Sequence, residues 1–206
     1  LVIAGKEEAR NPLQVALMTQ GGNAYRYAGF TGTIGAALAA NSEVLQFRFV
    51  SGTKTFCIVD KILFDGSAVV VAATAAGPLG FMATVARAWT VAGSGGTRIA
   101  MTGDNLQMET SEPNSQVNDL GIATTGALTA GTKTLDANAI GQCIGGVGTA
   151  ALTALGTNTT LISPQPLMDA SAGGPPLILA NQEGFVIRTT HAGPASLTYV
   201  AGFTIV

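Results

Sequence analysis

Charged residues are scarce in this sequence. They make up 11% of the 206 residues, against about a quarter in an average protein, and the formal net charge is −2. A chain that binds nucleic acid by neutralising phosphates should be basic, and a disordered chain should be charged and poor in apolar residues. Glu and Lys are also too few for a coiled coil. Since 47% of the residues are hydrophobic, we expect a folded core and no nucleic-acid partner.

Cysteine and histidine are equally rare. Cys57 and Cys143 lie far apart, and a chain of this length buries about 70% of its extended surface without help from a disulfide. Two free thiols and a reducing compartment of synthesis are therefore expected. His191 is the single histidine, and two Cys with one His at these spacings match no zinc pattern. Because His191 precedes Gly193 and Pro194 in a predicted turn, we expect a surface residue rather than a catalytic base.

Neither a secretion signal nor a membrane span is expected. Leu1–Arg10 has a short apolar start followed by charges, without the long apolar centre of a signal peptide. The uncharged stretch Gly66–Ala86 is interrupted by Gly77, Pro78 and Gly80, and its consecutive valines favour strands. We interpret it as two strands joined by a Gly-Pro turn, and we predict no membrane partner.

Alternation of apolar and polar residues with period two is the dominant pattern. It runs through Glu43–Val50, Thr55–Phe64, Phe81–Val91, Gly184–Thr190 and Ser196–Val206. Thr55–Phe64 is apolar on both faces, which indicates a central strand. His191–Pro194 separates the last two runs, which are therefore expected to form a hairpin. The residues expected to face the core are Leu45, Phe47, Phe49, Phe56, Ile58, Ile62, Val85, Trp89, Phe185, Ile187, Tyr199 and Phe203.

Helical signals are few. Thr33–Ala40 and Gly103–Glu109 could each form a short helix, which is marginal without tertiary support. Glycine, proline and polar residues predict loops at Gly93–Gly96, Ser111–Asp119 and Pro164–Pro176. Gly121–Thr160 consists mostly of Gly, Ala, Thr, Leu and Asn, and we interpret it as thin strands and loops that a neighbouring subunit buries.

These patterns predict an all-β fold. Short strands broken by glycine and proline turns favour a β-sandwich, jelly-roll-like, with long Gly/Ala/Thr-rich loops, and a closed barrel is the alternative. We expect residues 1–42 to form an N-terminal arm that contacts neighbouring subunits. Residues 43–206 are expected to form the sandwich, with a loop-rich insertion near residues 103–176.

Candidate catalytic groups are weak. The close carboxylate pairs are Glu7 with Glu8, Glu109 with Glu112, and Asp60 with Asp65. The first two pairs are interpreted as solvated surface charge. Asp60 follows an apolar run, so a buried ion pair is expected there, with a neighbour of Lys61 or with Arg87 as its partner.

No cofactor, metal or catalytic residue is predicted. The glycine clusters Gly93–Arg98 and Gly141–Gly148 lack the spacing of a phosphate-binding or dinucleotide-binding loop. Basic residues occur singly and form no patch. An aromatic platform for sugars stays open as an alternative, with Tyr25, Tyr27, Trp89 and Tyr199 as its candidates.

Four segments resemble poorly characterised virion structural proteins encoded by tailed bacteriophages and prophages. They are Ala36–Phe49 (AALAANSEVLQFRF), Ala86–Gly96 (ARAWTVAGSGG), Lys133–Ala137 (KTLDA) and Pro175–Arg188 (PPLILANQEGFVIR). The resemblance implies a virion component that is synthesised in the host cytoplasm. It includes no catalytic motif and assigns no functional residue.

Assembly is the function that these observations favour. A chain with so little charge and no membrane span is expected to bury its surface against other proteins. We therefore expect a homo-oligomer on a capsid lattice, as a decoration (cement) protein or another head component. The alternative is a receptor- or glycan-binding module of a tail fibre or spike. An enzyme, such as a wall-degrading domain, is disfavoured because no acid–base constellation is evident.

Overall fold

The computed structural model describes residues 24–35, 37–51, 55–71, 77–100, 117–147, 160–195 and 197–206. Within these ranges the chain is built from β-strands, with one short 3-10 turn, η1 (Ala170–Ala172). The strands are β1 (Tyr27–Phe30), β2 (Glu43–Val50), β3 (Phe56–Val59), β4 (Lys61–Val71), β5 (Gly77–Val91), β6 (Gly96–Ala100), β7 (Val117–Ala123), β8 (Thr132–Val147), β9 (Thr160–Asp169), β10 (Leu177–Ala180), β11 (Glu183–Thr189) and β12 (Leu197–Ile205).

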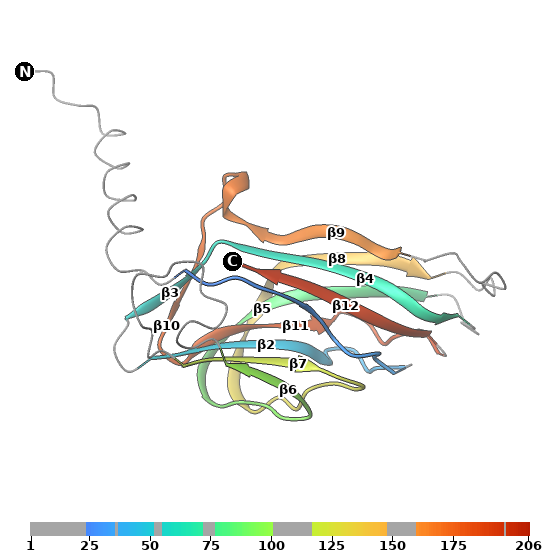
Figure 1. Ribbon diagram of the computed structural model, residues 1–206, viewed down its shortest axis with the longest axis horizontal. Helices are drawn as coiled ribbons and strands as arrows, with labels where there is room; N and C mark the ends of the chain where they lie inside the picture. The colour runs from blue at the N-terminus through green and yellow to red at the C-terminus, as the bar shows by residue number, and fades with distance from the viewer. Residues whose placement is uncertain are drawn as a thin grey trace, which may run out of the picture.

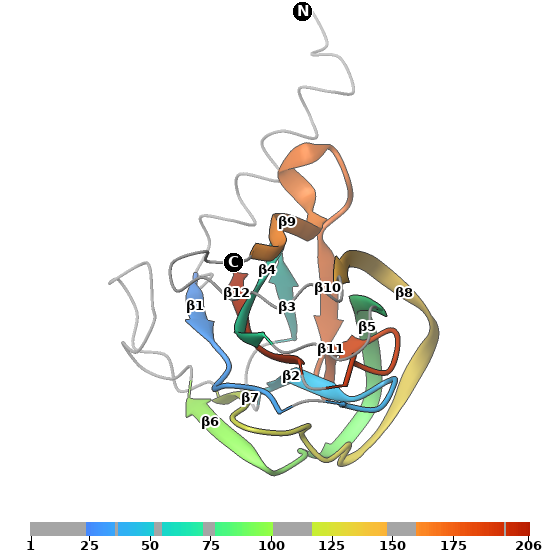
Figure 2. The same cartoon turned by 90° about the vertical axis from the view of Figure 1, so that its right-hand side faces the viewer.

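Two antiparallel sheets face each other across the core. The larger has the order β6-β7-β2-β11-β5-β8, and the smaller has the order β1-β12-β4-β9 (Figure 1; Figure 2). A separate two-stranded ribbon, β10-β3, lies at one end of the molecule (Figure 1). The all-β sandwich is therefore confirmed. The strand orders do not by themselves define a jelly roll, and that part of the expectation stays a prediction.

The core is built from aromatic and branched side chains of both sheets. The Phe64 ring of β4 lies 4.5 Å from the Phe81 ring of β5, and Phe81 also contacts Tyr199 of β12 edge-on at 5.6 Å. These centroid distances fall within the range of favourable aromatic pairs, so the rings join the two sheets directly. The predicted core residues that the structure buries are Leu45, Phe47, Phe49, Ile62, Val85, Trp89, Phe185, Ile187, Tyr199 and Phe203.

The predictions for Phe56 and Ile58 are wrong, since both side chains are largely exposed. The run Thr55–Phe64 is not one strand, because the backbone amides of Asp60 and Lys61 both donate to the carbonyl of Val206, at 2.7 and 3.1 Å. At this break the inward-facing positions change from odd to even numbers. Val59 is therefore buried in β3, whereas Ile62 is buried in β4.

Two predicted connections are also wrong. β11 pairs with β2 and β5 in the larger sheet, whereas β12 pairs with β1 and β4 in the smaller one. The residues between β11 and β12 therefore cross from one sheet to the other and form no hairpin. Gly77 and Pro78 lie inside β5, opposite Val147 and Gly146 of β8, rather than in a turn. Alternation fixes which face of a strand is buried, but it does not say which strand lies beside it.

The described part of Gly121–Thr160 contains the predicted loop at residues 124–131 but also one long strand, and residues 148–159 lie outside the described residues. β8 covers 16 residues and pairs with β5 along most of its length. Its small residues permit a close approach to β9, because a Cβ atom at Gly141 would clash with the carbonyl oxygen of Leu167. The contact between β8, at the edge of the larger sheet, and β9, at the edge of the smaller sheet, thereby closes one side of the sandwich.

The opposite side of the sandwich is joined by residues 31–35. The amides of Thr31 and Ile34 donate to β12, and the amides of Gly32 and Gly35 donate to carbonyls at positions 123 and 125. No helix forms in the described part of Thr33–Ala40, because its backbone groups are used in these bonds. The described part of the predicted N-terminal arm thus belongs to the sandwich.

The loop predictions are mixed. Residues 93–95 form the predicted turn, whereas residues 164–169 of the predicted loop Pro164–Pro176 belong to β9. The predicted helix Gly103–Glu109 and most of the loop Ser111–Asp119 lie outside the described residues. Strands β7, β8 and β9 all fall within the expected insertion at residues 103–176, and they contribute to both sheets.

Candidate assembly surface

His191 has the surface position that the sequence predicts. It is exposed in the connection between β11 and β12, and its Nδ1 lies 2.7 Å from the hydroxyl of its neighbour Thr190. Within the described ranges, no group of three or more His, Cys, Asp or Glu side chains is placed to hold a metal ion.

Of the predicted carboxylate pairs, Asp60 with Asp65 is the one that lies within the described residues. Glu7, Glu8, Glu109 and Glu112 lie outside the described residues. Asp60 and Asp65 are both partly buried, and burial raises the pKa of Asp65. The suggested pairing of Asp60 with Arg87 is wrong. The Arg87 guanidinium instead binds Asp136 at 3.2 Å and Glu183 at 2.7 Å.

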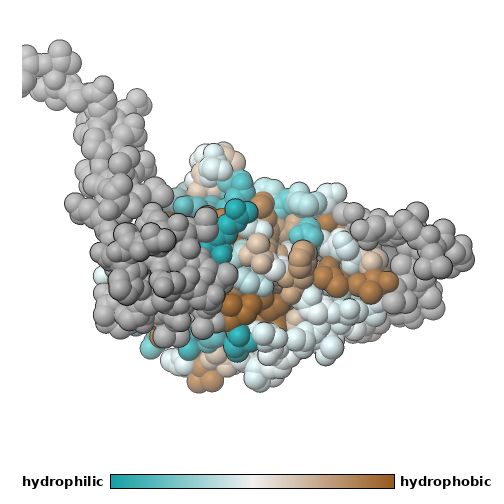
Figure 3. All heavy atoms as spheres, in the orientation of Figure 1, coloured by the Kyte–Doolittle hydropathy of each residue, from teal (hydrophilic) through white to brown (hydrophobic). Residues whose placement is uncertain are grey.

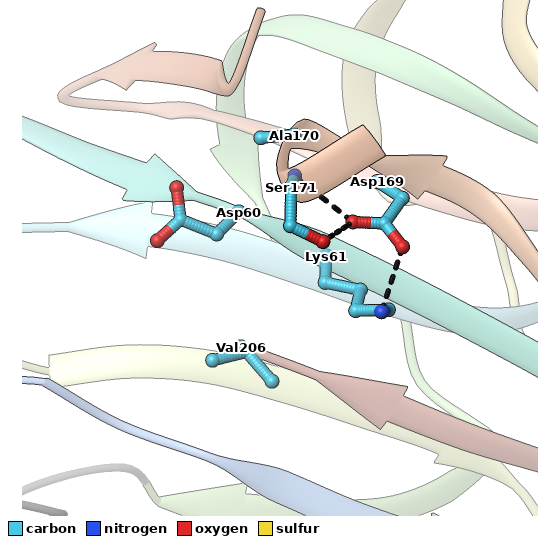
Figure 4. A pocket seen from close by; sticks show the side chains of 6 residues that line it. All are labelled: Asp60, Lys61, Asp169, Ala170, Ser171 and Val206. Carbon is cyan, nitrogen blue, oxygen red and sulfur yellow. Dashed lines mark hydrogen bonds and ion pairs between the residues drawn. The ribbon is translucent and has the colours of Figure 1, made fainter. Parts of the chain in front are cut away.

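A pocket of about 400 Å³ lies where β4, β9 and η1 meet (Figure 4). Lys61 Nζ lies 2.7 Å from Asp169 Oδ2, while the amide and hydroxyl of Ser171 both donate to Asp169 Oδ1. The bonds from Lys61 and Ser171 hold the pKa of Asp169 below its usual range, so this carboxylate is a poor base. The lining residues are Asp60, Lys61, Asp169, Ala170, Ser171 and Val206.

The pocket does not have the geometry of a nucleophilic site. The Ser171 hydroxyl points at Asp169, and the Asp60 carboxylate points away from the Lys61–Asp169 pair (Figure 4). An activated serine needs a base that is free to accept its proton, and both oxygens of Asp169 already accept bonds. The arrangement anchors η1 to β4.

Both cysteines are free thiols, as expected, and neither has the environment of a nucleophile. Burial, with a smaller contribution from the Asp60 charge, raises the pKa of Cys57 to about 12. Burial raises the pKa of Cys143 to about 11. Reactive cysteines have lowered pKa values and electropositive surroundings, so these thiols are structural.

A buried polar cluster, which the sequence did not reveal, ties two loops to the larger sheet. Glu43 Oε2 accepts bonds from Gln46 Nε2 at 2.6 Å and from Lys133 Nζ at 2.9 Å. Gln46 also binds the carbonyl of Thr129 and the amide of Gly93. The Lys133 ammonium lies 4.6 Å from the centre of the Trp89 ring. Every charge in this cluster is partnered, so it stabilises the fold rather than offering a free acid or base.

The β3–β10 ribbon presents an exposed apolar surface. Its register places Ile58 opposite Ile178, and Phe56 opposite Ala180. These four side chains share one face because alternate residues of a strand point the same way. Phe56 is 45% exposed, Ile58 41% and Ile178 58%. We call this set the ribbon face. Its sequence signal was the apolar character of both sides of Thr55–Phe64.

Figure 3 shows the hydropathy of one face of the molecule. Hydrophobic residues form bands across the middle of the described part, pale residues of intermediate hydropathy lie around them, and hydrophilic residues gather in small separate groups. In the ranges that the structure describes, no helix has the length and apolar character needed to cross a bilayer.

Comparison of the chain with protein-family models, with curated protein sequences and with solved structures gave no match.

Proposed function

We propose that this chain is a non-enzymatic structural protein of a virion, a capsid decoration protein or another head component. It acts by binding copies of itself and other virion proteins. The observation that carries the proposal is the ribbon face, a contiguous apolar surface with no charged member on a chain that is only 11% charged. The resemblance of four segments to phage structural proteins supports the same function.

The alternative, a glycan- or receptor-binding module, has less support. Sugar-binding platforms need exposed aromatic rings with polar edges. Trp89, Tyr27 and Tyr199 are buried, and Tyr25 is partly buried. Phe30 and Phe56 are the largely exposed aromatics, and they lie on different strands of different sheets.

The proposal is tested on particles of the phage or prophage that encodes the sequence. We expect mass spectrometry to find the chain in washed virions and imaging to place it on the head. Because the contacts are largely uncharged, washing in high salt should not release it. The variant His191→Ala should assemble normally, since this side chain is exposed and β11 separates it from β10 of the ribbon along the chain. Absence of the chain from washed virions would contradict the proposal.

A further inference from the structure

The ribbon face is built like an interior surface. All eight residues of β3 (FCIV) and β10 (LILA) are uncharged. The opposite side of the ribbon is already used, because Val59 and Leu179 are buried in the core and Cys57 and Leu177 pack against it. A strand that is apolar on both sides is typical of a strand buried on both sides. Within the described part of the chain, the other side of this ribbon is left exposed at Phe56, Ile58 and Ile178.

The ribbon is also incomplete as a sheet. Among the described residues, β3 and β10 pair with each other and with no third strand. A two-stranded ribbon is marginally stable in water and normally gains stability from packing on a hydrophobic surface. The core-facing side of the ribbon is already packed on a hydrophobic surface, and the ribbon face offers a second apolar surface for packing.

We propose that the ribbon face binds the ribbon face of a second copy of this chain, an inference that rests on the proposed function. The face has no charge with which to attract or orient a charged partner, so its complement is itself apolar. A second copy of the chain carries such an apolar surface, and it is present wherever the first copy is. In a two-fold contact the same patch serves both partners, and Ile58 and Ile178 lie side by side within it.

The size of the face sets the strength of the contact. Scaled from the roughly 150–250 Å² that an aromatic side chain buries, its exposed side chains present on the order of 300 Å². Two such faces bury on the order of 600 Å², about half of a standard stable interface. A pair of copies in solution should therefore associate weakly. On a particle, where many copies are held close together, the same contact becomes effective through high local concentration.

The first experiment compares self-association of the full chain and two matched variants by sedimentation velocity over a wide concentration range. Ile178→Lys places a charge in the face, and Val91→Lys places one at a similarly exposed valine, 55% exposed, on β5. We expect Ile178→Lys to weaken self-association at least tenfold and Val91→Lys to leave it unchanged. Circular dichroism of both variants establishes that they are folded. Equal behaviour of the two folded variants would overturn the proposal.

The second experiment detects the contact even when it is weak. Ala180→Cys adds a thiol to the face, and Ala28→Cys adds one to an exposed alanine of β1. The native thiols react slowly because of their raised pKa values. A short bismaleimide should link Ala180→Cys into covalent dimers and leave Ala28→Cys monomeric. Equal yields from the two variants would show that copies do not meet through this face.

The outcomes separate this proposal from the proposed function. If the chain is present in virions but Ala180→Cys does not cross-link, the virion role stands and copies meet elsewhere. If Ala180→Cys cross-links but the chain is absent from virions, the copy–copy contact stands and the virion role fails. Should removal of residues 1–23 abolish association while Ala180→Cys stays unlinked, the N-terminal segment is the contact and the ribbon face is not.

Discussion

Glu43 and Lys133 are charged side chains that the protein withholds from solvent, 7% and 2% exposed respectively. Desolvation of a charge is costly, and the geometry here offsets that cost through the 2.9 Å contact, the Gln46 amide and the Trp89 ring. Desolvation lowers the pKa of Lys133, which its bond to Glu43 opposes. Replacing either member of the pair alone should therefore lower the stability of the protein.

We predict that Lys133→Met lowers the free energy of unfolding by about 3–5 kcal/mol, because the Glu43 carboxylate then stays buried without its cation. Urea titration followed by circular dichroism measures the change. Lys61→Met is the control, since the Lys61–Asp169 pair lies closer to solvent and its loss should change stability far less. Equal losses in the two variants would mean that the Glu43–Lys133 pair is solvated.

The two thiols provide a second test. At pH 8 we expect both to react with a soluble disulfide reagent at least about a hundredfold more slowly than a free cysteine, because the thiolate fraction falls tenfold with each unit of pKa. Both should react quickly after denaturation. Fast reaction of the native protein would contradict the burial of Cys57 and Cys143.

The same pKa values predict how stability depends on pH. The folded thiols retain protons that the unfolded chain releases from about pH 9 upward. The free energy of unfolding should therefore be unaffected by these groups below pH 9 and should fall as the pH rises toward their folded pKa values. Replacing both cysteines with alanine should remove this part of the decline, as measured by urea unfolding at several pH values.

These side-chain interactions could not be predicted from the sequence. Glu43 and Lys133 are separated by 90 positions, and no local pattern relates them. The ion pair was expected at Asp60, whereas the pair that forms in this region joins Lys61 to Asp169 of β9. Pairing across a sandwich depends on which strands become neighbours, and that information is not local.

β5 shows how one backbone conformation redirects a strand. Phe81, Ala83 and Val85 face the core, and Ala88 then adopts a positive φ of 48°. The register against β8 shifts between Arg87 and Val91, as in a β-bulge. Beyond this point Trp89 packs with Ala86 and Val186 on the other side of the sheet, in a cluster separate from the main core.

We predict that Ala88→Gly stabilises the protein by about 1 kcal/mol, because glycine adopts a positive φ without the steric cost that alanine incurs. Ala139→Gly, at an exposed position of β8 without a positive φ, should instead destabilise it by roughly 0.5–1 kcal/mol. Thermal unfolding of the two variants measures both changes. A loss of stability in both would argue against the conformation at Ala88.

Core packing between the sheets gives a further prediction. The Phe47 ring stacks on Phe185 at 5.3 Å, and Ile187 is fully buried beside them on β11. Phe47→Ala should cost roughly 3–5 kcal/mol and Ile187→Ala about 2–5 kcal/mol, through lost contacts and the cavity that remains. Phe30→Ala, at a ring that is 68% exposed, should cost far less. Unchanged urea midpoints for both buried variants would contradict the register of β2 and β11.

Individual strands were predictable to a useful degree, and their neighbours were not. Glu43–Val50 and Ser196–Val206 alternate cleanly, and the structure forms β2 and β12 there. β8 escaped prediction because its Gly, Ala and Thr residues carry little hydrophobic periodicity, and its strand conformation depends on pairing with β5.

The arrangement of the two sheets leaves the β3–β10 ribbon outside both of them. The sequence predicted an apolar, weakly charged sandwich, and the structure adds the location of the uncovered surface. That location was hidden because the change of facing at Asp60 cannot be seen in the residue pattern of Thr55–Phe64. The missing information was again tertiary, since the break depends on bonds to Val206.

The pairing of β1 with β12 joins positions that are distant along the chain, from Tyr27 opposite Ile205 to Phe30 opposite Gly202. During synthesis the ribosome releases β1 long before β12 exists. Since β12 also lies between β1 and β4, the smaller sheet cannot assemble in order as the chain emerges. Strand β1, and the edge of β4 that does not pair with β9, must wait unpaired until residue 205 has left the exit tunnel. Translation therefore sets the earliest moment at which the sandwich can close, and a nascent chain stalled before β12 should remain sensitive to protease.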